Sequence, residues 1–167
     1  MVIREARPGD LAAIGEIYNH YVRTSTCTYQ VEPSTPADMA AWLAAHGGSH
    51  PATVAVDGHG DGDDGTVVGY GALSSFRDRY GYRFSVENSV YVRHDLHGRG
   101  IGRAILLDLI ERARGLGMKT IVAGISAGET ASLAIHRRHG FVDVGLIKSV
   151  GYKLDAWLDL VFLQLML

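Results

Sequence analysis

The sequence predicts an α/β fold with a mixed, mostly antiparallel central sheet flanked by helices on both faces. Segments with strand-like and helix-like patterns follow one another in the order βααβββαβαββ along the 167 residues. Near the middle of the chain a strand leads through a glycine-rich turn into a helix, and two alternating apolar segments end the chain. Neither an internal repeat nor a linker interrupts this order, so we expect a single domain over residues 1–167.

The N-terminal half begins with a short strand and continues with two helices. Pro8 suits the first turn of a helix, and apolar residues then recur at helical spacing from Leu11 to Val22. Thr35-Pro36-Ala37-Asp38 has the capping chemistry that opens a second helix. The predicted elements are a strand over residues 2–6, a helix from 8 to about 22, an irregular segment over 24–36, a helix continuing to 43, and strands over 51–56 and 66–75.

The acidic loop between the last two strands, residues 57–65, raises the question of calcium. An EF-hand loop needs oxygen ligands at alternate positions, glycine at the sixth position and glutamate at the twelfth. The loop sequence DGHGDGDDG has no such register. A solvated, mobile hairpin turn explains it better, because loop entropy grows only slowly with length.

The C-terminal half is organised around residues 87–114. Glu87 to Val92 is rich in valine and tyrosine, as strands are, and apolar residues at helical spacing follow from Ala104 to Ala113. The remaining predicted elements are the end of this helix at Gly115 and Gly117, a strand over 119–125, a helix over 131–138 ended by Gly140, and strands over 141–150 and 158–165.

The turn His97-Gly98-Arg99-Gly100-Ile101-Gly102 predicts an anion site. Its glycines let a ligand approach the backbone, and the first N–H groups of the following helix lack internal partners at the positive end of the helix dipole. Phosphate or pyrophosphate is the natural ligand of such a site. A Walker A loop would end in Gly-Lys-Ser/Thr, and a dinucleotide fingerprint would have glycine where Arg103 stands, so neither motif matches.

Composition excludes several classes of function. The apolar fraction of 47% and the charged fraction of 20% are those of a soluble globular protein, and a net charge of −2 argues against wholesale binding to nucleic acid or membrane. No apolar run approaches the ~18 residues that cross a bilayer, and the N-terminus is too polar for a signal peptide. The single cysteine, Cys27, cannot form an internal disulfide, so we expect a cytoplasmic protein.

Four pieces of sequence carry a family resemblance over nearly the whole chain: IYNHYV with TST and TYQVEP, YRFSVENSVYV, HGRGIG, and the pair ASLAIHRRHGF and VGYKLDAWLDLVFLQ. Together they resemble the phosphinothricin and methionine sulfoximine N-acetyltransferases, a branch of the GCN5-related N-acetyltransferase (GNAT) superfamily. HGRGIG is similar to the superfamily's pyrophosphate loop, Q/R-x-x-G-x-G/A. The tail is more diagnostic of the branch, through Gly151, Lys153, Trp157 and Asp159.

The resemblance implies a GNAT fold, acetyl-CoA as co-substrate and a homodimer. It also implies transfer of acetyl to the α-amino group of a small glutamate-like amino acid, with resistance to such a compound as either the purpose or an accident of pocket shape. Two alternatives stay open: another amine, such as a modified amino acid or a peptide N-terminus, and a non-catalytic acyl-CoA-binding module. A polyamine is disfavoured because an arginine cluster would repel it.

The resemblance places acetyl-CoA along one strand and the glycine-rich turn. Backbone N–H groups of the strand would hold the acetyl group and pantetheine, which requires a bulge or a splay from the neighbouring strand. His97 stands where Gln or Arg is usual, and Glu129 replaces a frequent Asn, so that a carboxylate takes the place of an amide donor. The expected cofactor-binding residues are Val90, Tyr91, Val92, His97, Gly98, Arg99, Gly100, Ile101, Gly102, Arg103 and Glu129.

Acetyl transfer to an amine needs a base for the amine, stabilisation of the carbonyl oxygen and a proton for the departing thiolate. Glu87 matches the family's strand glutamate, and its apolar neighbours would raise its pKa, as suits a base. The alternative is an ordinary surface glutamate. His136 stands where many members of the superfamily carry a tyrosine that protonates the thiolate, and it is either that donor or a partly buried structural histidine.

Arg77 and Arg79 are the expected substrate-binding residues, since guanidinium forks bind carboxylates and phosphinates. The resemblance implies that they face the amino acid, with Asn88 assisting; the alternative is a pair of solvent-facing loop arginines. Cys27 has no visible base partner, which favours direct transfer without an acyl-enzyme. His136 and His139 lie three residues apart without a third ligand nearby, so we expect no metal.

Overall fold

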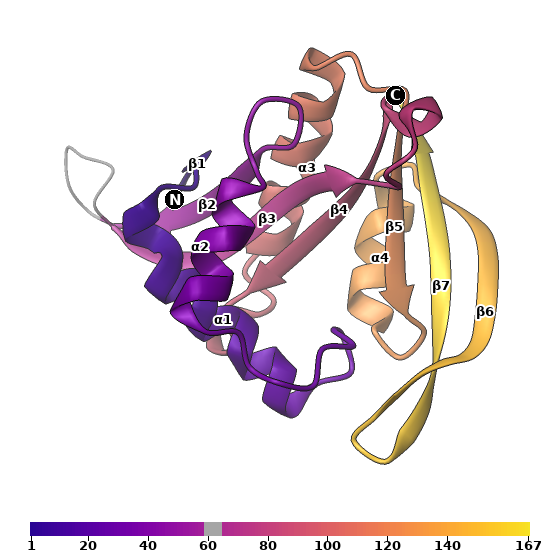
Figure 1. Cartoon of the computed structure of the whole chain (residues 1–167), viewed down its shortest axis with the longest axis horizontal. Helices are drawn as coiled ribbons and strands as arrows, with labels where there is room; N and C mark the ends of the chain where they lie inside the picture. Colours follow the sequence, from indigo (N-terminus) through magenta and orange to yellow (C-terminus); the bar gives the residue numbers. More distant parts are fainter. Residues whose placement is uncertain (59–64) are drawn as a thin grey trace.

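The computed structural model describes residues 1–58 and 65–167, and these contain one seven-stranded sheet and four α-helices (Figure 1). The strands are β1 (Val2–Glu5), β2 (Ala52–Asp57), β3 (Thr66–Ser75), β4 (Ser85–Val92), β5 (Thr120–Ser126), β6 (Val142–Lys153) and β7 (Ala156–Met166). The helices are α1 (Leu11–Thr24), α2 (Pro36–Ala44), α3 (Ile101–Gly115) and α4 (Thr130–Arg138). The predicted order of elements is confirmed.

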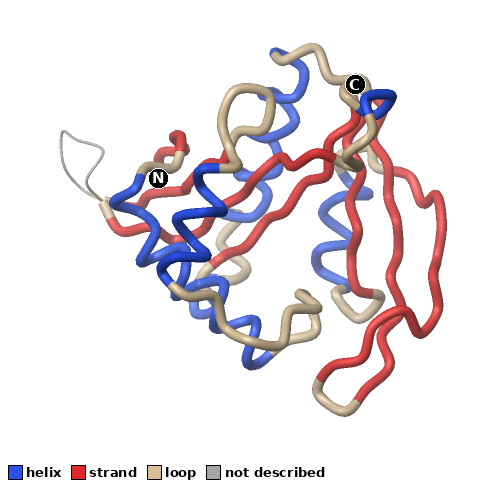
Figure 2. Tube along the Cα trace, viewed as in Figure 1, coloured by secondary structure: helices blue, strands red, loops and turns tan. Residues whose placement is uncertain are grey.

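The sheet has the strand order β1-β2-β3-β4-β5-β7-β6. Every neighbouring pair is antiparallel except β4 and β5, which are parallel. Helices α1 and α2 cover one face of the sheet, and α3 and α4 cover the other (Figures 1 and 2). The mixed, mostly antiparallel sheet with helices on both faces is therefore confirmed.

Each face of the sheet has its own core. On the α3 and α4 face, Leu73, Ile105, Leu109 and Leu163 have no exposed surface. On the α1 and α2 face, Ile14 and Val54 are fully buried among aromatic side chains. Within the described residues, none of the helices is both long and apolar enough to span a membrane.

The capping sequence before α2 behaves as predicted. The backbone N–H of Asp38 donates to Thr35 Oγ1 at 3.2 Å, and the Asp38 carboxylate accepts from the N–H of Thr35 at 2.8 Å. These two hydrogen bonds satisfy orphan donors at the helix start. Strands β2 and β3 are the antiparallel partners that the sequence predicted. Most of the acidic loop between them, residues 59–64, lies outside the described residues. The prediction of a hairpin turn without calcium in this loop therefore also falls outside them.

The C-terminal hairpin is longer than the sequence predicted. Strand β6 continues to Lys153 and β7 begins at Ala156, where the sequence indicated an interruption between residues 150 and 158. The two turn residues, Leu154 and Asp155, have φ of 51° and 58°. Such turns favour glycine, asparagine and aspartate, so Asp155 fits the turn but Leu154 does not, and the turn signal in the sequence is weak.

Candidate functional site

Strands β4 and β5 separate in the middle of the sheet. They pair only from Ser85 to Glu87, opposite Thr120 to Val122, whereas β4 stays paired with β3 as far as Val92. Beyond Glu87 the edge of β4 that faces β5 has therefore lost its partner strand. The predicted splay is confirmed.

The open edge of β4 offers the backbone groups of alternate residues. The N–H of Arg93 donates to Val68 of β3 at 2.9 Å, and the carbonyl oxygen of Tyr91 lies toward Gly69 of the same strand. Because the direction of backbone groups alternates along a strand, Val90 and Val92 direct theirs toward the gap. Tyr91 instead contributes its side chain, which stacks on Tyr70 at 5.2 Å between ring centroids.

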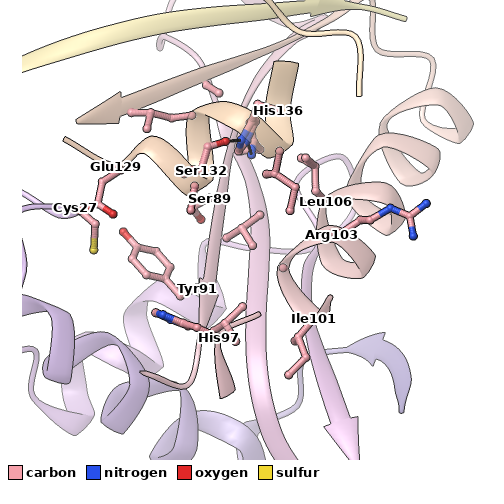
Figure 3. A pocket seen from close by; sticks show the side chains of 18 of the residues that line it. Cys27, Ser89, Tyr91, His97, Ile101, Arg103, Leu106, Glu129, Ser132 and His136 are labelled. Atoms are coloured by element: carbon pink, nitrogen blue, oxygen red, sulfur yellow. Dashed lines mark hydrogen bonds between the residues drawn. The ribbon is translucent and has the colours of Figure 1, made fainter. Parts of the chain in front are cut away.

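A cavity of about 520 Å³ occupies the gap (Figure 3). It lies between β4, the glycine-rich turn, β5 and α4, and the segment after α1 closes one side. Glu87, Arg77, Arg79 and Arg99 are outside its lining. The other predicted residues all line it: Asn88, Val90, Tyr91, Val92, His97, Gly98, Gly100, Ile101, Gly102, Arg103, Glu129 and His136.

The glycine-rich turn forms one end of this cavity. Gly98 and Gly100 have φ of 78° and 80°, a left-handed conformation that other residues adopt only with strain. Space is not the constraint, because an added Cβ would meet no atom within 4 Å at either position. Helix α3 begins directly after Gly100, so its first N–H groups and the positive end of its dipole lie at the turn.

His97 joins the turn to α1. Its Nε2 lies 2.6 Å from the Tyr21 hydroxyl, which also donates to the carbonyl oxygen of Val92. Since a carbonyl can only accept, the hydroxyl proton belongs to that bond, and His97 Nε2–H must donate to Tyr21. His97, which stands where Gln or Arg is usual, therefore connects the turn to α1 through its side chain.

Glu87 lies where β4 and β5 part. Its carboxylate packs over Gly124 of β5, where an added Cβ would lie 3.1 Å from Glu87 Oε1. Partial burial raises the pKa of Glu87, and the positive charge of Arg77 acts in the opposite, weaker direction. The sequence prediction of a raised pKa at Glu87 agrees with this environment.

Asn88 and His136 pair on the other face of β4. The Asn88 amide donates to His136 Nε2 at 2.9 Å, and His136 Nδ1 donates to the carbonyl oxygen of Ser132 at 2.8 Å. Both side chains are buried, and desolvation lowers the pKa of His136. The imidazole is therefore neutral, with its proton on Nδ1 and both nitrogens engaged.

Arg77 and Arg79 lie on an exposed segment before β4. The Arg77 guanidinium stacks over the ring of Phe76 at 4.3 Å and donates to the Phe76 carbonyl at 2.7 Å. Of the two, Arg77 is close enough to Glu87 to lower its pKa by charge. Asn88 does not join them, because it is buried beside His136.

Other parts of the cavity were not predicted from the sequence. Figure 3 shows the Tyr91 hydroxyl directed toward Cys27 and Glu129, on the side that the segment after α1 closes. Tyr21, Cys27, Ser126, Ser132 and Arg138 also line the cavity. The only indication in the sequence that these residues line the cavity is that they lie close to predicted site residues or elements. No group of three or more metal-ligating side chains occurs in residues 1–58 and 65–167.

The known proteins that this chain resembles are acetyltransferases. A model of the acetyltransferase (GNAT) family matches residues 14–141. An L-methionine sulfoximine/L-methionine sulfone acetyltransferase of Pseudomonas paraeruginosa is 42% identical, over 98% of this chain and 92% of its own length.

Two solved structures share the fold over nearly the whole chain. A phosphinothricin acetyltransferase of Sinorhizobium meliloti in complex with acetyl-CoA has a TM-score of 0.93 and 38% identity, covering 99% of this chain and 88% of its own. A ribosomal-protein-alanine N-acetyltransferase from Brucella melitensis has a TM-score of 0.90 and 38% identity, covering 100% of both chains.

Proposed function

The chain belongs to the acetyltransferase (GNAT) family, and from that premise we propose that it acetylates the α-amino group of a small glutamate-like amino acid. Acetyl-CoA is the acetyl donor of this N-acetyltransferase. Phosphinothricin, methionine sulfoximine and methionine sulfone represent the acceptor class. The observation that carries the proposal is the gap between β4 and β5, with the glycine-rich turn at one end and Glu87 where the strands part.

The gap offers groups that could bind the pyrophosphate and the pantetheine arm of acetyl-CoA. The N–H groups at the start of α3 would bind its pyrophosphate, and Arg103, which lines the same end, would add positive charge. Backbone groups of Val90 and Val92 would bind the pantetheine arm as a strand binds its neighbour. Acetyl-CoA would supply the activated acetyl group.

Glu87 is the proposed general base. An amine must lose a proton before it attacks a thioester, and a carboxylate with a raised pKa accepts that proton more readily than an ordinary one. Glu87, Ser89 and Tyr91 share the α1 and α2 face of β4 by strand alternation. We therefore place the acceptor amine on this face. Burial raises the pKa of the Cys27 thiol, which favours direct transfer over an acyl-cysteine.

His136 is proposed as a positioning residue. Its Nε2 accepts a hydrogen bond from Asn88 and carries no proton to give to a thiolate, so this geometry favours the structural alternative. The pair would fix the wall of the cavity on the α3 and α4 face. Arg77, and Arg79 from the same segment, would bind the acidic group of the acceptor beside Glu87.

A peptide N-terminus is the second candidate acceptor, because one structural neighbour is named a ribosomal-protein-alanine N-acetyltransferase. The test is thiol release from acetyl-CoA with phosphinothricin, methionine sulfoximine, methionine sulfone, ordinary amino acids and an alanine-terminated peptide. Turnover confined to the first three, and reduced in Arg77→Gln but not in the exposed control Arg114→Gln, supports the proposal. Turnover with the peptide alone contradicts the acceptor and the role of Arg77.

We also propose that the chain forms a homodimer through β6. This strand is the outer strand of the sheet and exposes a row of apolar side chains, with Val142 61% and Leu146 52% exposed. An exposed edge of this kind favours pairing with a second copy. Leu146→Lys should shift the mass in light scattering toward the monomer, while Val2→Lys, 60% exposed on the opposite edge, should not. A wild-type monomer at micromolar concentration would contradict the proposal.

A further inference from the structure

Lys153 is a buried lysine at the tip of the β6–β7 hairpin. The residue is 4% exposed, although lysine is among the residues least often buried. The ammonium donates to three backbone carbonyl oxygens, those of Ser25 at 2.7 Å, Thr28 at 2.8 Å and Tyr21 at 3.3 Å. Three donors thus meet three acceptors, which offsets the loss of hydration.

These carbonyl oxygens belong to the C-terminal end of α1 and the segment that follows. Tyr21 lies in the last turn of the helix, and Ser25 is the first residue after it. A cation at this end interacts favourably with the helix dipole. The hairpin therefore fixes both the end of α1 and the direction that the chain takes afterwards.

A second contact ties the same segment to the hairpin. The ring of Tyr29 packs on Gly151, where an added Cβ would lie 2.8 Å from two ring atoms. The Tyr29 hydroxyl donates to the carbonyl oxygen of Asp159 at 3.2 Å, and the same oxygen accepts from the N–H of Ala127 at 2.9 Å. The hairpin thus holds the segment after α1 and the turn between β5 and α4 together.

Both of these segments form a wall of the cavity. Tyr21 and Cys27 line it from one segment, and Ser126 and Glu129 line it from the other. The Ser25 hydroxyl links them, because it donates to Glu129 Oε1 at 3.5 Å and accepts from the N–H of Cys27 at 3.1 Å. The ammonium of Lys153 therefore lies directly behind this wall.

We propose that Lys153 is a positioning residue for acetyl transfer, whose ammonium holds residues 25–28 in place as one wall of the acetyl-CoA cavity. The expected effect on KM for acetyl-CoA rests on the proposed function, whereas the expected effect on the position of residues 25–28 does not. Lys153, Gly151 and Asp159 would then act together, since each contacts the segment after α1, and Asp159 also contacts the turn between β5 and α4.

The test uses Lys153→Met, which removes the ammonium and keeps a long apolar side chain. Lys148→Met, at an exposed lysine of the same strand, is the matched control. Cys27 is the only cysteine, so its rate of reaction with a thiol reagent such as DTNB reports the position of the wall in the folded protein. Thermal unfolding of each variant shows that the reaction is measured on folded chains.

Lys153→Met should make Cys27 react about tenfold faster and should raise KM for acetyl-CoA about tenfold, with a much smaller change in kcat, since a displaced wall impairs positioning. Lys148→Met should leave both values unchanged. A variant of lower stability with wild-type Cys27 reactivity and wild-type KM would make Lys153 merely structural and would overturn the proposal.

Two further arms keep the test decisive. Faster labelling of Cys27 in a preparation whose wild type has no activity with any amine would support the wall and count against the proposed function. If Lys153→Met does not fold, Lys153→Arg keeps the positive charge but replaces the compact ammonium with a wider planar group that cannot meet the same three carbonyl oxygens. Faster labelling and a higher KM in folded Lys153→Arg would support the proposal, and wild-type values would overturn it.

Discussion

Asn88 donates a hydrogen bond of 2.9 Å to Nε2 of His136, on the face of β4 opposite to Glu87. Alternate residues of a strand face opposite sides of the sheet, so Glu87 and Tyr91 lie toward α1, whereas Val90 and Val92 pack in the core of α3. The open edge of β4 runs between these two sets of side chains. Strand β4 thus has the proposed base Glu87 on one face and the neutral His136 on the other, and the backbone of its open edge faces the cavity.

The pair predicts how stability responds to acid. Burial lowers the pKa of His136 below its ordinary 6.5, so the unfolded chain takes up a proton before the folded chain does. The free energy of unfolding should be insensitive to this group at neutral pH and should fall as the pH drops below 6.5. Urea unfolding at several pH values should show a shallower acid loss in His136→Gln than in the wild type. Equal slopes would contradict the assignment of a neutral His136.

Gly100→Ala should weaken acetyl-CoA binding. The φ of 80° at Gly100 costs a residue with a Cβ roughly 1–2 kcal/mol, so the turn should relax and misplace the first N–H groups of α3. We expect a several-fold rise in KM for acetyl-CoA with kcat nearly unchanged. Gly115→Ala, at the last position of the same helix with open space around it, is the control and should be neutral or stabilising. Equal KM values in both variants would argue against a strained anion site.

Gly124→Ala should move the proposed base. The added Cβ would lie 3.1 Å from Glu87 Oε1, closer than an unstrained contact, so the carboxylate must shift away from β5. Because general-base catalysis depends on hydrogen-bond reach, we expect kcat to fall by roughly tenfold or more. Gly124 also lines the cavity, so the affinity for CoA is measured by calorimetry beside kcat and should fall less than kcat does. Gly145→Ala, which meets no atom within 4 Å, controls for the substitution itself, and equal kcat values in the two variants would refute the contact.

The fold could be predicted from the sequence because its signals are local. Helical spacing, the Thr35 cap and alternating apolar residues each depend on neighbours within a few positions. The glycine-rich turn between a strand and a helix was predictable for the same reason, whereas the left-handed conformation of Gly98 and Gly100 was not predicted. The tip of the C-terminal hairpin was not predicted because Leu154, a residue type that rarely adopts positive φ, occupies the first of its two turn positions.

The remaining features of the site depend on contacts between distant segments. The splay of β4 from β5 involves residues about 35 positions apart, and nothing near Glu87 marks where pairing ends. The sequence left open whether His136 donates a proton, and only its two hydrogen-bond partners resolve its tautomer. Lys153 is typical of the branch in sequence, yet its contacts with Ser25 and Thr28 become visible only in three dimensions.

Glu87→Gln tests whether Glu87 is the base of this acetyl-CoA-dependent transferase. The measurement compares the affinity for acetyl-CoA by calorimetry with kcat/KM for the amine acceptor across pH. In the wild type, kcat/KM should fall as the pH drops through the raised pKa of Glu87, since a protonated base cannot accept a proton. In Glu87→Gln, we expect unchanged affinity for acetyl-CoA, a loss of about 10²–10⁴-fold in turnover, and no acidic limb. A Glu87→Gln enzyme that keeps wild-type turnover and the same acidic limb would show that Glu87 is not the base.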